Sequence, residues 1–137
     1  MYYILIFSVC IFVSIQGCRE NPEKYFGYGY SLSNKTDDLH IVGPKCNIGE
    51  GPVINCKSNV QFITMKEKPR MKIYDKYGLW KKSNREPERE KLFNAIKYYD
   101  YWIIDMPVDS VYGPYQKAEF EKKFDELNLP DSLRVDK

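Results

Sequence analysis

Side chains that could perform acid–base or metal chemistry are few in this 137-residue chain. The single histidine, His40, lies in a short apolar run without a cysteine, serine or carboxylate signature beside it. Catalysis needs such a partner at a matched position, so we expect a structural role for His40. The adjacent Asp37 and Asp38 occupy a polar turn, which offers too few oxygens for Ca²⁺. We therefore expect no catalytic residue, no metal and no cofactor, and a protein that is not an enzyme.

The first seventeen residues form an apolar segment that leads into a cysteine motif. From residue 2 to residue 15 the chain carries no charged side chain. A membrane span needs about 20 residues, whereas the apolar part of a signal peptide has about 7–15. The sequence IQGC (15–18) follows, and it resembles the lipobox of bacterial lipoproteins. Ile15 matches the aliphatic position, Gly17 the small position and Cys18 the lipidated cysteine.

The lipobox resemblance implies cleavage before Cys18 and a diacylglyceryl group on its thiol. Each buried CH₂ contributes about 0.8 kcal/mol, so two or three acyl chains hold a protein stably on a membrane. The expected organisation is a lipoprotein signal peptide (1–17), the lipidated cysteine with a tether (18–24) and one small domain (25–137). The alternatives are an ordinary signal peptide or an uncleaved anchor with Cys18 incidental. Apolar length and cleavage context agree, which favours a lipoprotein of the cell envelope that faces the periplasm or the exterior.

Two further cysteines, Cys46 and Cys56, lie in the expected mature chain. The stretch between them contains two glycines and a proline, so it can turn back on itself. In an exported chain such a pair indicates a disulfide, and the alternative is two separate buried thiols. We expect the bridge, which would contribute about 3 kcal/mol in the chain-entropy model. Two cysteines with one distant histidine do not make a zinc ligand set.

The composition is typical of one small folded domain and not of a nucleic-acid-binding protein. Aromatic residues make up 15% of the chain, which is enough bulk for a hydrophobic core. Lys and Arg number 21 against 19 Asp and Glu, and the two signs are mixed along the sequence. A nucleic-acid-binding protein usually concentrates its basic residues on one face. We therefore expect no nucleic-acid partner.

The apolar periodicities predict an α+β fold. Period-two alternation, β-branched residues and aromatic residues predict a mostly antiparallel sheet of about five to seven strands. These strands are expected at residues 25–32, 39–42, 52–56, 60–65, 71–80, 101–105 and 111–113. An amphipathic helix at 115–128 should pack on one face of the sheet, and a second, short helix is expected at 83–98. The run at 101–105 is apolar on both faces, which predicts burial on both sides. Residues 132–135 should add a last extended piece.

The last third of the chain carries a family resemblance. The segments YWIID (101–105), VYGP (111–114), EF (119–120) and LNLP (127–130) resemble a group of short bacterial lipoproteins known as domain of unknown function 3997. The resemblance implies a lipid-anchored, β-rich domain with no known activity and no catalytic residues to assign. Residues 71–97 look like an insertion relative to that compact pattern.

The excess of tyrosine is the remaining functional indication. Tyr25, Tyr28, Tyr30, Tyr112 and Tyr115 could form a surface that stacks on sugars or grips a protein. The alternative, that a small sheet fills its core and faces with tyrosine, is favoured. Two functions stay open: a non-enzymatic envelope domain that binds a partner protein, as an inhibitor or immunity-like factor, and a binding module for carbohydrate or another small ligand. Coplanar tyrosines in a groove would favour the ligand, and a flat apolar patch with a charged rim the protein.

Overall fold

The computed structural model of the chain describes residues 24–34, 38–82 and 85–136. The expected signal peptide, Cys18 and most of the expected tether lie outside the described residues. The fold is α+β, as expected, and its described strands form two antiparallel sheets of four strands each. The first sheet contains β1 (Lys24–Gly27), β2 (Tyr30–Asn34), β3 (Leu39–Val42) and β4 (Asn47–Ile48). The second sheet contains β5 (Val53–Ser58), β6 (Phe62–Glu67), β7 (Asp100–Asp105) and β8 (Ser110–Tyr115).

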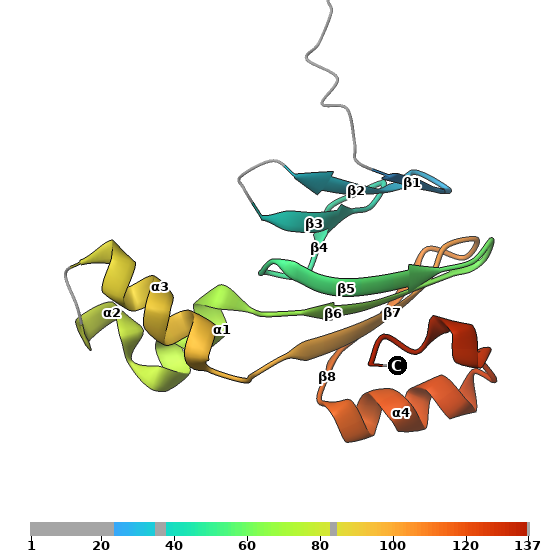
Figure 1. Ribbon diagram of the computed structural model, residues 1–137. Coiled ribbons are helices and arrows are strands. Elements are labelled where there is room, and N and C mark those ends of the chain that lie inside the picture. Colours follow the sequence, from blue (N-terminus) through green and yellow to red (C-terminus); the bar gives the residue numbers. More distant parts are fainter. Residues whose placement is uncertain (1–23, 35–37, 83–84, 137) are drawn as a thin grey trace, which may run out of the picture.

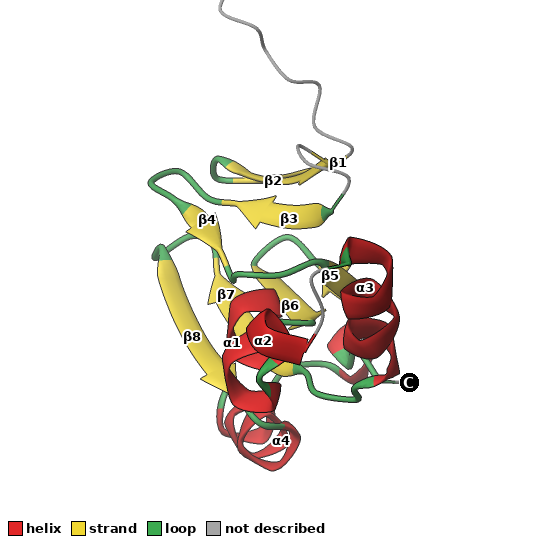
Figure 2. Ribbon diagram, turned by 90° about the vertical axis from the view of Figure 1, so that its left-hand side faces the viewer, coloured by secondary structure: helices red, strands yellow, loops and turns green. Residues whose placement is uncertain are grey.

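The two sheets and the C-terminal helix form three layers (Figure 1). The first sheet lies on one face of the second sheet, and α4 (Lys117–Glu126) lies on the other face, as Figure 2 shows from the side. Between β6 and β7 the chain forms α1 (Arg70–Tyr77), α2 (Leu79–Lys82) and α3 (Glu86–Ala95), which project from the side as a helical lobe. The segment 71–97, which was expected to be an insertion, lies in this lobe, between two strands that pair with each other.

Strand β7 is the centre of the molecule because both of its faces are buried, as the sequence predicted. Ile104 packs towards the first sheet, in a core with Ile63 and Met65 of β6. Ile103 points the opposite way, because successive side chains alternate along a strand, and it packs with Phe120 of α4. Each of these five apolar side chains is almost completely shielded from solvent, and such burial contributes about 1.5–3 kcal/mol per side chain.

The C-terminal helix is shorter than the predicted range because caps define both of its ends. Gln116 and Glu119 form a capping box, in which the Gln116 N–H donates to the Glu119 carboxylate over 3.1 Å. At the other end Asn128 adopts a positive φ of 51°, and the Leu129 N–H donates to the Phe124 carbonyl. The chain then forms a short 3₁₀-helix, η1 (Asp131–Leu133), so the extended piece expected at 132–135 is wrong.

The strand predicted at 71–80 is also wrong, because this segment is helical. Pro69 precedes α1, and the Ile73 N–H donates to its carbonyl over 3.0 Å. Gly78 ends the helix in the left-handed conformation. The buried residues of α1, Ile73 and Tyr74, pack with Phe93 of α3 in a separate small core of the lobe. The second predicted helix exists as α3, which begins at Glu86 and ends well before residue 98.

The first predicted strand, 25–32, is in fact a hairpin. Gly27, Tyr28 and Gly29 all have positive φ values, and they turn the chain between β1 and β2. Glycine adopts this conformation at little cost, so the two glycines that seemed to interrupt a strand instead mark its end. Further along, β8 extends beyond the predicted 111–113 and includes the cis peptide bond before Pro114.

Candidate functional site

The five tyrosines singled out in the sequence do not share a surface. Tyr30 is only 1% exposed and belongs to the core between the sheets, so its predicted place on a binding surface is wrong. Tyr112 and Tyr115 lie on β8, half-buried against the core that α4 covers. Tyr25 and Tyr28 are exposed on the β1–β2 hairpin of the first sheet. A continuous platform of tyrosines for a sugar is therefore not formed by this set.

The expected disulfide between Cys46 and Cys56 is absent, and both residues are free thiols. Cys46 is exposed in the turn between β3 and β4 of the first sheet. Cys56 lies on β5 of the second sheet, where its side chain packs against the core between the sheets. The stretch between the two cysteines passes from the first sheet to the second instead of folding back on itself. Burial raises the pKa of the Cys56 thiol, which keeps it protonated.

Two of the residues considered in the sequence for catalysis or metal binding, His40 and Asp38, lie in the described part of the chain. His40 is half-buried on β3, opposite Ser33 of β2. Asp38 lies within 3.5 Å of the Arg70 guanidinium, so it links the first sheet to the lobe, while Asp37 lies outside the described residues.

Four turns gather at one end of the two sheets, which we call the turn end (Figure 1). They are the turns 27–29, 43–46, 59–61 and 106–109. The first two are adjacent, because a Cβ on Gly29 would lie 3.2 Å from Pro44. The last two are joined by a hydrogen bond of 2.9 Å from the Met106 N–H to the Gln61 carbonyl. The turn end is therefore a connected unit built from both sheets.

A cavity of about 180 Å³ at the turn end contains a clamped carboxylate. The Tyr30 hydroxyl donates to Oδ1 of Asp109 over 2.5 Å, and the Lys45 ammonium lies 2.7 Å from its Oδ2. Lys45 foremost, and then Tyr30, hold the pKa of Asp109 below its usual value. Because this carboxylate already has two partners, its evident role is to fasten the β7–β8 turn to the first sheet. The Cys46 thiol also lines the cavity.

The opposite end of the molecule, the helical lobe, displays an exposed tryptophan. Trp80 of α2 is 46% exposed, yet two contacts hold its indole ring in place. Its indole N–H donates to the Asp75 carboxylate over 2.7 Å, and its ring packs edge-to-face on Tyr74 at 4.9 Å between ring centres. Met71 is also exposed and lies one helical turn before Asp75 on α1. We call Met71, Asp75 and Trp80 the Trp80 patch.

Cations and aromatic rings connect the lobe to the second sheet. Arg70 lies 2.7 Å from Glu90 and 4.4 Å from the centre of the Phe93 ring, so it joins α1 to α3. Lys72 lies 2.6 Å from the buried Asp100 of β7, which contributes to a raised pKa of this lysine. Lys76 lies 4.5 Å from the ring centre of Tyr98. Of these contacts, the ion pair of Lys72 with Asp100 joins the lobe to the second sheet.

Glu67 is a buried carboxylate at the lobe end of β6, and it is only 1% exposed. Its Oε2 accepts hydrogen bonds from the N–H groups of Glu50 and Gly51 over 3.0 and 3.2 Å. Its Oε1 accepts one from the Trp102 indole over 2.8 Å. Burial raises the pKa of Glu67, and these three donors lower it in part. The carboxylate therefore fastens the β4–β5 connection to the second sheet.

Sequence reasoning missed the Trp80 patch because the segment 71–80 was interpreted as a strand. The signals for a helix were present: proline at position 69, glycine at position 78, and apolar residues at 73, 74 and 77. With that pattern Met71 and Asp75 fall on one helical face.

The chain belongs to a family described as protein of unknown function (DUF3997), whose model matches residues 29–137. The match covers the lobe, both sheets from the β1–β2 turn onwards, and the C-terminal helix. No curated protein and no solved structure matches the chain. In the described part of the chain, each helix is too short or too polar to cross a membrane.

Proposed function

We propose that the chain is a lipid-anchored, non-enzymatic protein of the bacterial envelope that binds a partner protein through the Trp80 patch. The lipobox-like motif at 15–18 supports the anchor at Cys18. The partner would be a protein that this chain inhibits or against which it protects, in the manner of an immunity factor. The carbohydrate alternative loses its main support, because its five tyrosines are dispersed over two sheets and a core.

The observation that carries this proposal is a tryptophan that is held rigid while almost half of it faces solvent. Tryptophan, tyrosine and arginine dominate the binding energy of protein interfaces. A side chain that is already ordered loses less conformational entropy on binding. The hydrogen bond from Trp80 to Asp75 and its packing on Tyr74 supply that order in the free protein.

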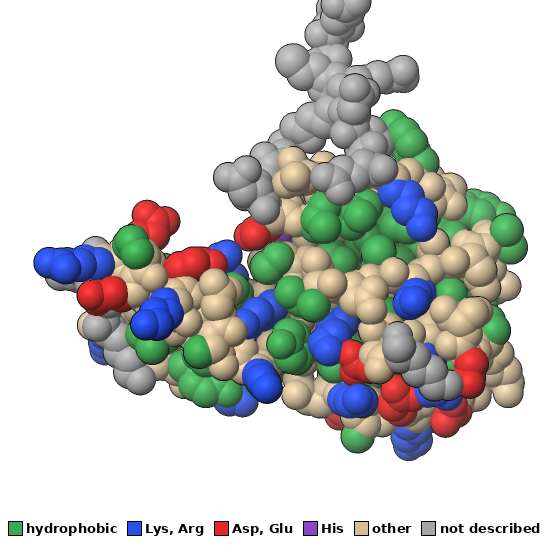
Figure 3. All heavy atoms as spheres, in the orientation of Figure 1, with side chains coloured by type: hydrophobic (Ala, Val, Ile, Leu, Met, Phe, Trp, Pro, Cys, Tyr) green, Lys and Arg blue, Asp and Glu red, His purple; other side chains and the backbone are tan. Residues whose placement is uncertain are grey.

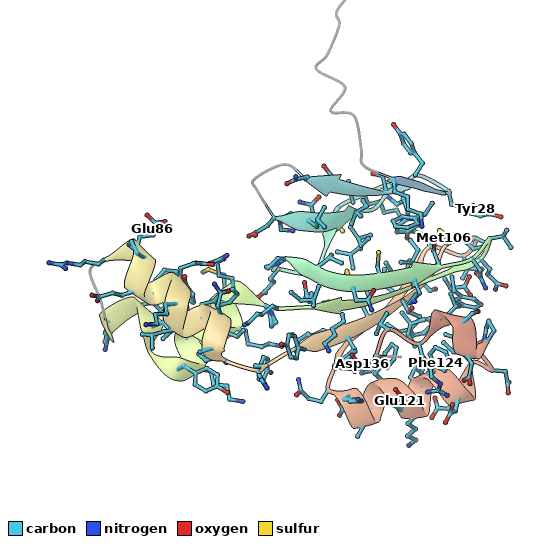
Figure 4. The ribbon with its side chains drawn as sticks, in the orientation of Figure 1. Tyr28, Glu86, Met106, Glu121, Phe124 and Asp136 are labelled. Atoms are coloured by element: carbon cyan, nitrogen blue, oxygen red, sulfur yellow. The ribbon has the colours of Figure 1, made fainter. Side chains whose placement is uncertain are left out.

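The surroundings of the Trp80 patch match a protein interface. Figure 3 shows hydrophobic side chains on the lobe between charged side chains of both signs. Lys76 and Lys81 are exposed close to the patch in sequence, and Glu86 is exposed at the start of α3, where Figure 4 shows it at the far end of the lobe. An apolar centre within a polar, charged rim is the usual anatomy of such an interface.

The anchor is tested with the variant Cys18→Ser. Cells are labelled with radioactive palmitate, and membranes are separated from the soluble fraction. The unchanged chain should be labelled and remain with the membranes, and the variant should lose the label and appear in the soluble fraction. Label that persists in Cys18→Ser would refute lipidation at this residue.

The binding role is tested by photo-crosslinking in the host cell. A photoreactive amino acid at Met71, one helical turn from the Asp75 that holds Trp80, should give one discrete crosslinked product. The additional substitution Trp80→Ala should abolish that product while far-UV circular dichroism stays unchanged. The control position is Ile54, which is similarly exposed but lies on β5. Products that form equally at both positions, or that persist in Trp80→Ala, would rule out the Trp80 patch as the interface.

A further inference from the structure

Three turns of the turn end each expose an apolar side chain at the tip. Tyr28 is 60% exposed, Val60 is 87% exposed and Val108 is 64% exposed. Figure 4 shows Tyr28 pointing away from the molecule, at the same end as Met106 of the β7–β8 turn. None of these three side chains is buried in the core. A single exposed apolar residue needs no explanation, but three apolar tips at one end of the molecule indicate a contact surface.

The tips are held in place and do not depend on a partner for their order. The Asn59 side-chain oxygen accepts hydrogen bonds from the N–H groups of Gln61 and Phe62 over 2.9 and 2.7 Å. This closed turn presents Val60 at its outermost point. The β7–β8 turn is fixed to it by the Met106–Gln61 hydrogen bond and to the first sheet by Asp109.

The conformation of Tyr28 is costly for an exposed residue. Its φ of 51° lies in the left-handed region, which glycine and asparagine adopt more easily than an aromatic residue. Strain of this kind clusters at functional sites such as ligand clamps and switch regions.

The charge of the tips restricts what they can contact. Within the four turns of the turn end the charged side chains are Lys45 and Asp109, which form an ion pair with each other. An acidic or basic partner therefore finds no complementary charge there. Tyrosine and aliphatic side chains without net charge are suited to the interfacial region of a bilayer.

The length of chain before β1 places a bilayer within reach. Six residue steps separate Cys18 from Lys24, where β1 begins, and an extended chain spans at most about 3.3–3.6 Å per residue, or about 20 Å over these steps. Four further steps, about 13 Å along β1, lead from Lys24 to Tyr28 at the turn end. If Cys18 carries the acyl chains, the tips can therefore touch the membrane that holds them. The helical lobe lies at the other end of the molecule (Figure 1).

We propose that the turn end is a membrane-contacting face, on which Tyr28, Val60 and Val108 enter the headgroup region of the bilayer. This proposal rests on the lipid anchor of the proposed function for its reach. It also orients the molecule, because contact at the turn end directs the Trp80 patch away from the membrane, towards a partner.

The test uses the full chain, isolated from its host membranes and reconstituted in vesicles of phosphatidylethanolamine and phosphatidylglycerol with brominated acyl chains. Bromine quenches tryptophan fluorescence only at short range. Val60→Trp should add a fluorescence component that is blue-shifted and lost on bromination. The matched control is Leu92→Trp, at an exposed position on α3 of the lobe, whose added component should not be quenched. Both variants also contain Trp80 and Trp102, so the fluorescence of these two residues cancels when the variants are compared.

Equal quenching in Val60→Trp and Leu92→Trp, or no quenching in either, would overturn membrane contact at the turn end. A blue shift of Val60→Trp without quenching would show that a protein, such as a second copy of the chain, covers the tips, and would also overturn it. Mass spectrometry of the same sample separates the two proposals. Unacylated Cys18 would refute the anchor and this proposal with it, whereas acylated Cys18 with unquenched Val60→Trp would refute the membrane contact alone.

Discussion

The substitution Glu67→Gln should destabilise the fold by removing one acceptor from a buried site. Glutamine keeps the shape of the side chain but has one oxygen where glutamate has two. If the glutamine oxygen accepts the hydrogen bonds from the Glu50 and Gly51 N–H groups, its NH₂ group faces the Trp102 indole N–H. Two hydrogen-bond donors then point at each other without an acceptor. A buried donor without an acceptor costs about 1–3 kcal/mol. Relief from burying a charge offsets part of this cost at neutral pH.

The loss of stability caused by Glu67→Gln should depend on pH, and the raised pKa of Glu67 gives the direction of that dependence. The folded state holds the proton more tightly than the unfolded chain does, whose glutamate pKa is about 4.3. The contribution of Glu67 to stability is therefore fully present below that value and is lost as pH rises through the higher folded-state pKa. Glutamine has no such dependence. The free-energy difference between the original chain and Glu67→Gln should consequently shrink as pH rises from about 4 towards 7.

Urea unfolding of the mature chain, followed by far-UV circular dichroism, measures both effects. The variant Trp102→Phe removes the opposing donor, so Glu67→Gln should cost less in that background, with a coupling on the order of 1 kcal/mol. The control is Glu126→Gln on the surface of α4, which should change stability by at most about 0.5 kcal/mol at any pH. A cost that increases with pH, or effects of Glu67 and Trp102 that simply add, would refute the description of this site.

Three further predictions test the lobe, the thiols and the connection between the sheets. Phe93→Ala should cost about 3–5 kcal/mol in the lobe, so hydrogen exchange should accelerate in α1–α3 while β7 stays protected. Iodoacetamide should modify the exposed Cys46 faster than the half-buried Cys56, whose pKa is raised, and a disulfide-linked peptide would contradict this. Gly51→Ala should lower the midpoint of thermal unfolding, because its Cβ would meet the Lys68 carbonyl oxygen; an unchanged midpoint would contradict that contact.

The sequence predicted best the elements whose side chains are apolar on a simple period. Strand β7 was recognised because YWIID is apolar on both faces, and α4 because Phe120 and Phe124 recur one helical turn apart. Both depend on local pattern and on bulk hydrophobicity. The division of the strands into two sheets was not predictable in the same way, because it depends on how hairpins stack after they form.

The candidate site was less predictable, since exposure depends on tertiary packing. Tyr28 and Tyr30 are two residues apart in the sequence, yet the first ends in solvent and the second in the core. The positive φ values around the turn separate them, and a period-two pattern gives no sign of that. Similarly, the loop between Cys46 and Cys56 contains residues that can turn back, but it crosses to the second sheet instead.

Two carboxylates explain how the first sheet can orient the rest of the molecule. Its strands are short, β4 has only two residues, and such a sheet is marginal without support from packing. Asp109 fastens it to the second sheet at the turn end, and Glu67 fastens its connection at the lobe end, with the apolar core of both sheets between them. The two sheets are thus joined at both ends, and the ion pair of Lys72 with Asp100 joins the second sheet to the lobe. A contact made at Tyr28 and Val60 would therefore set the direction in which Trp80 points, which a flexible link between the sheets would not allow.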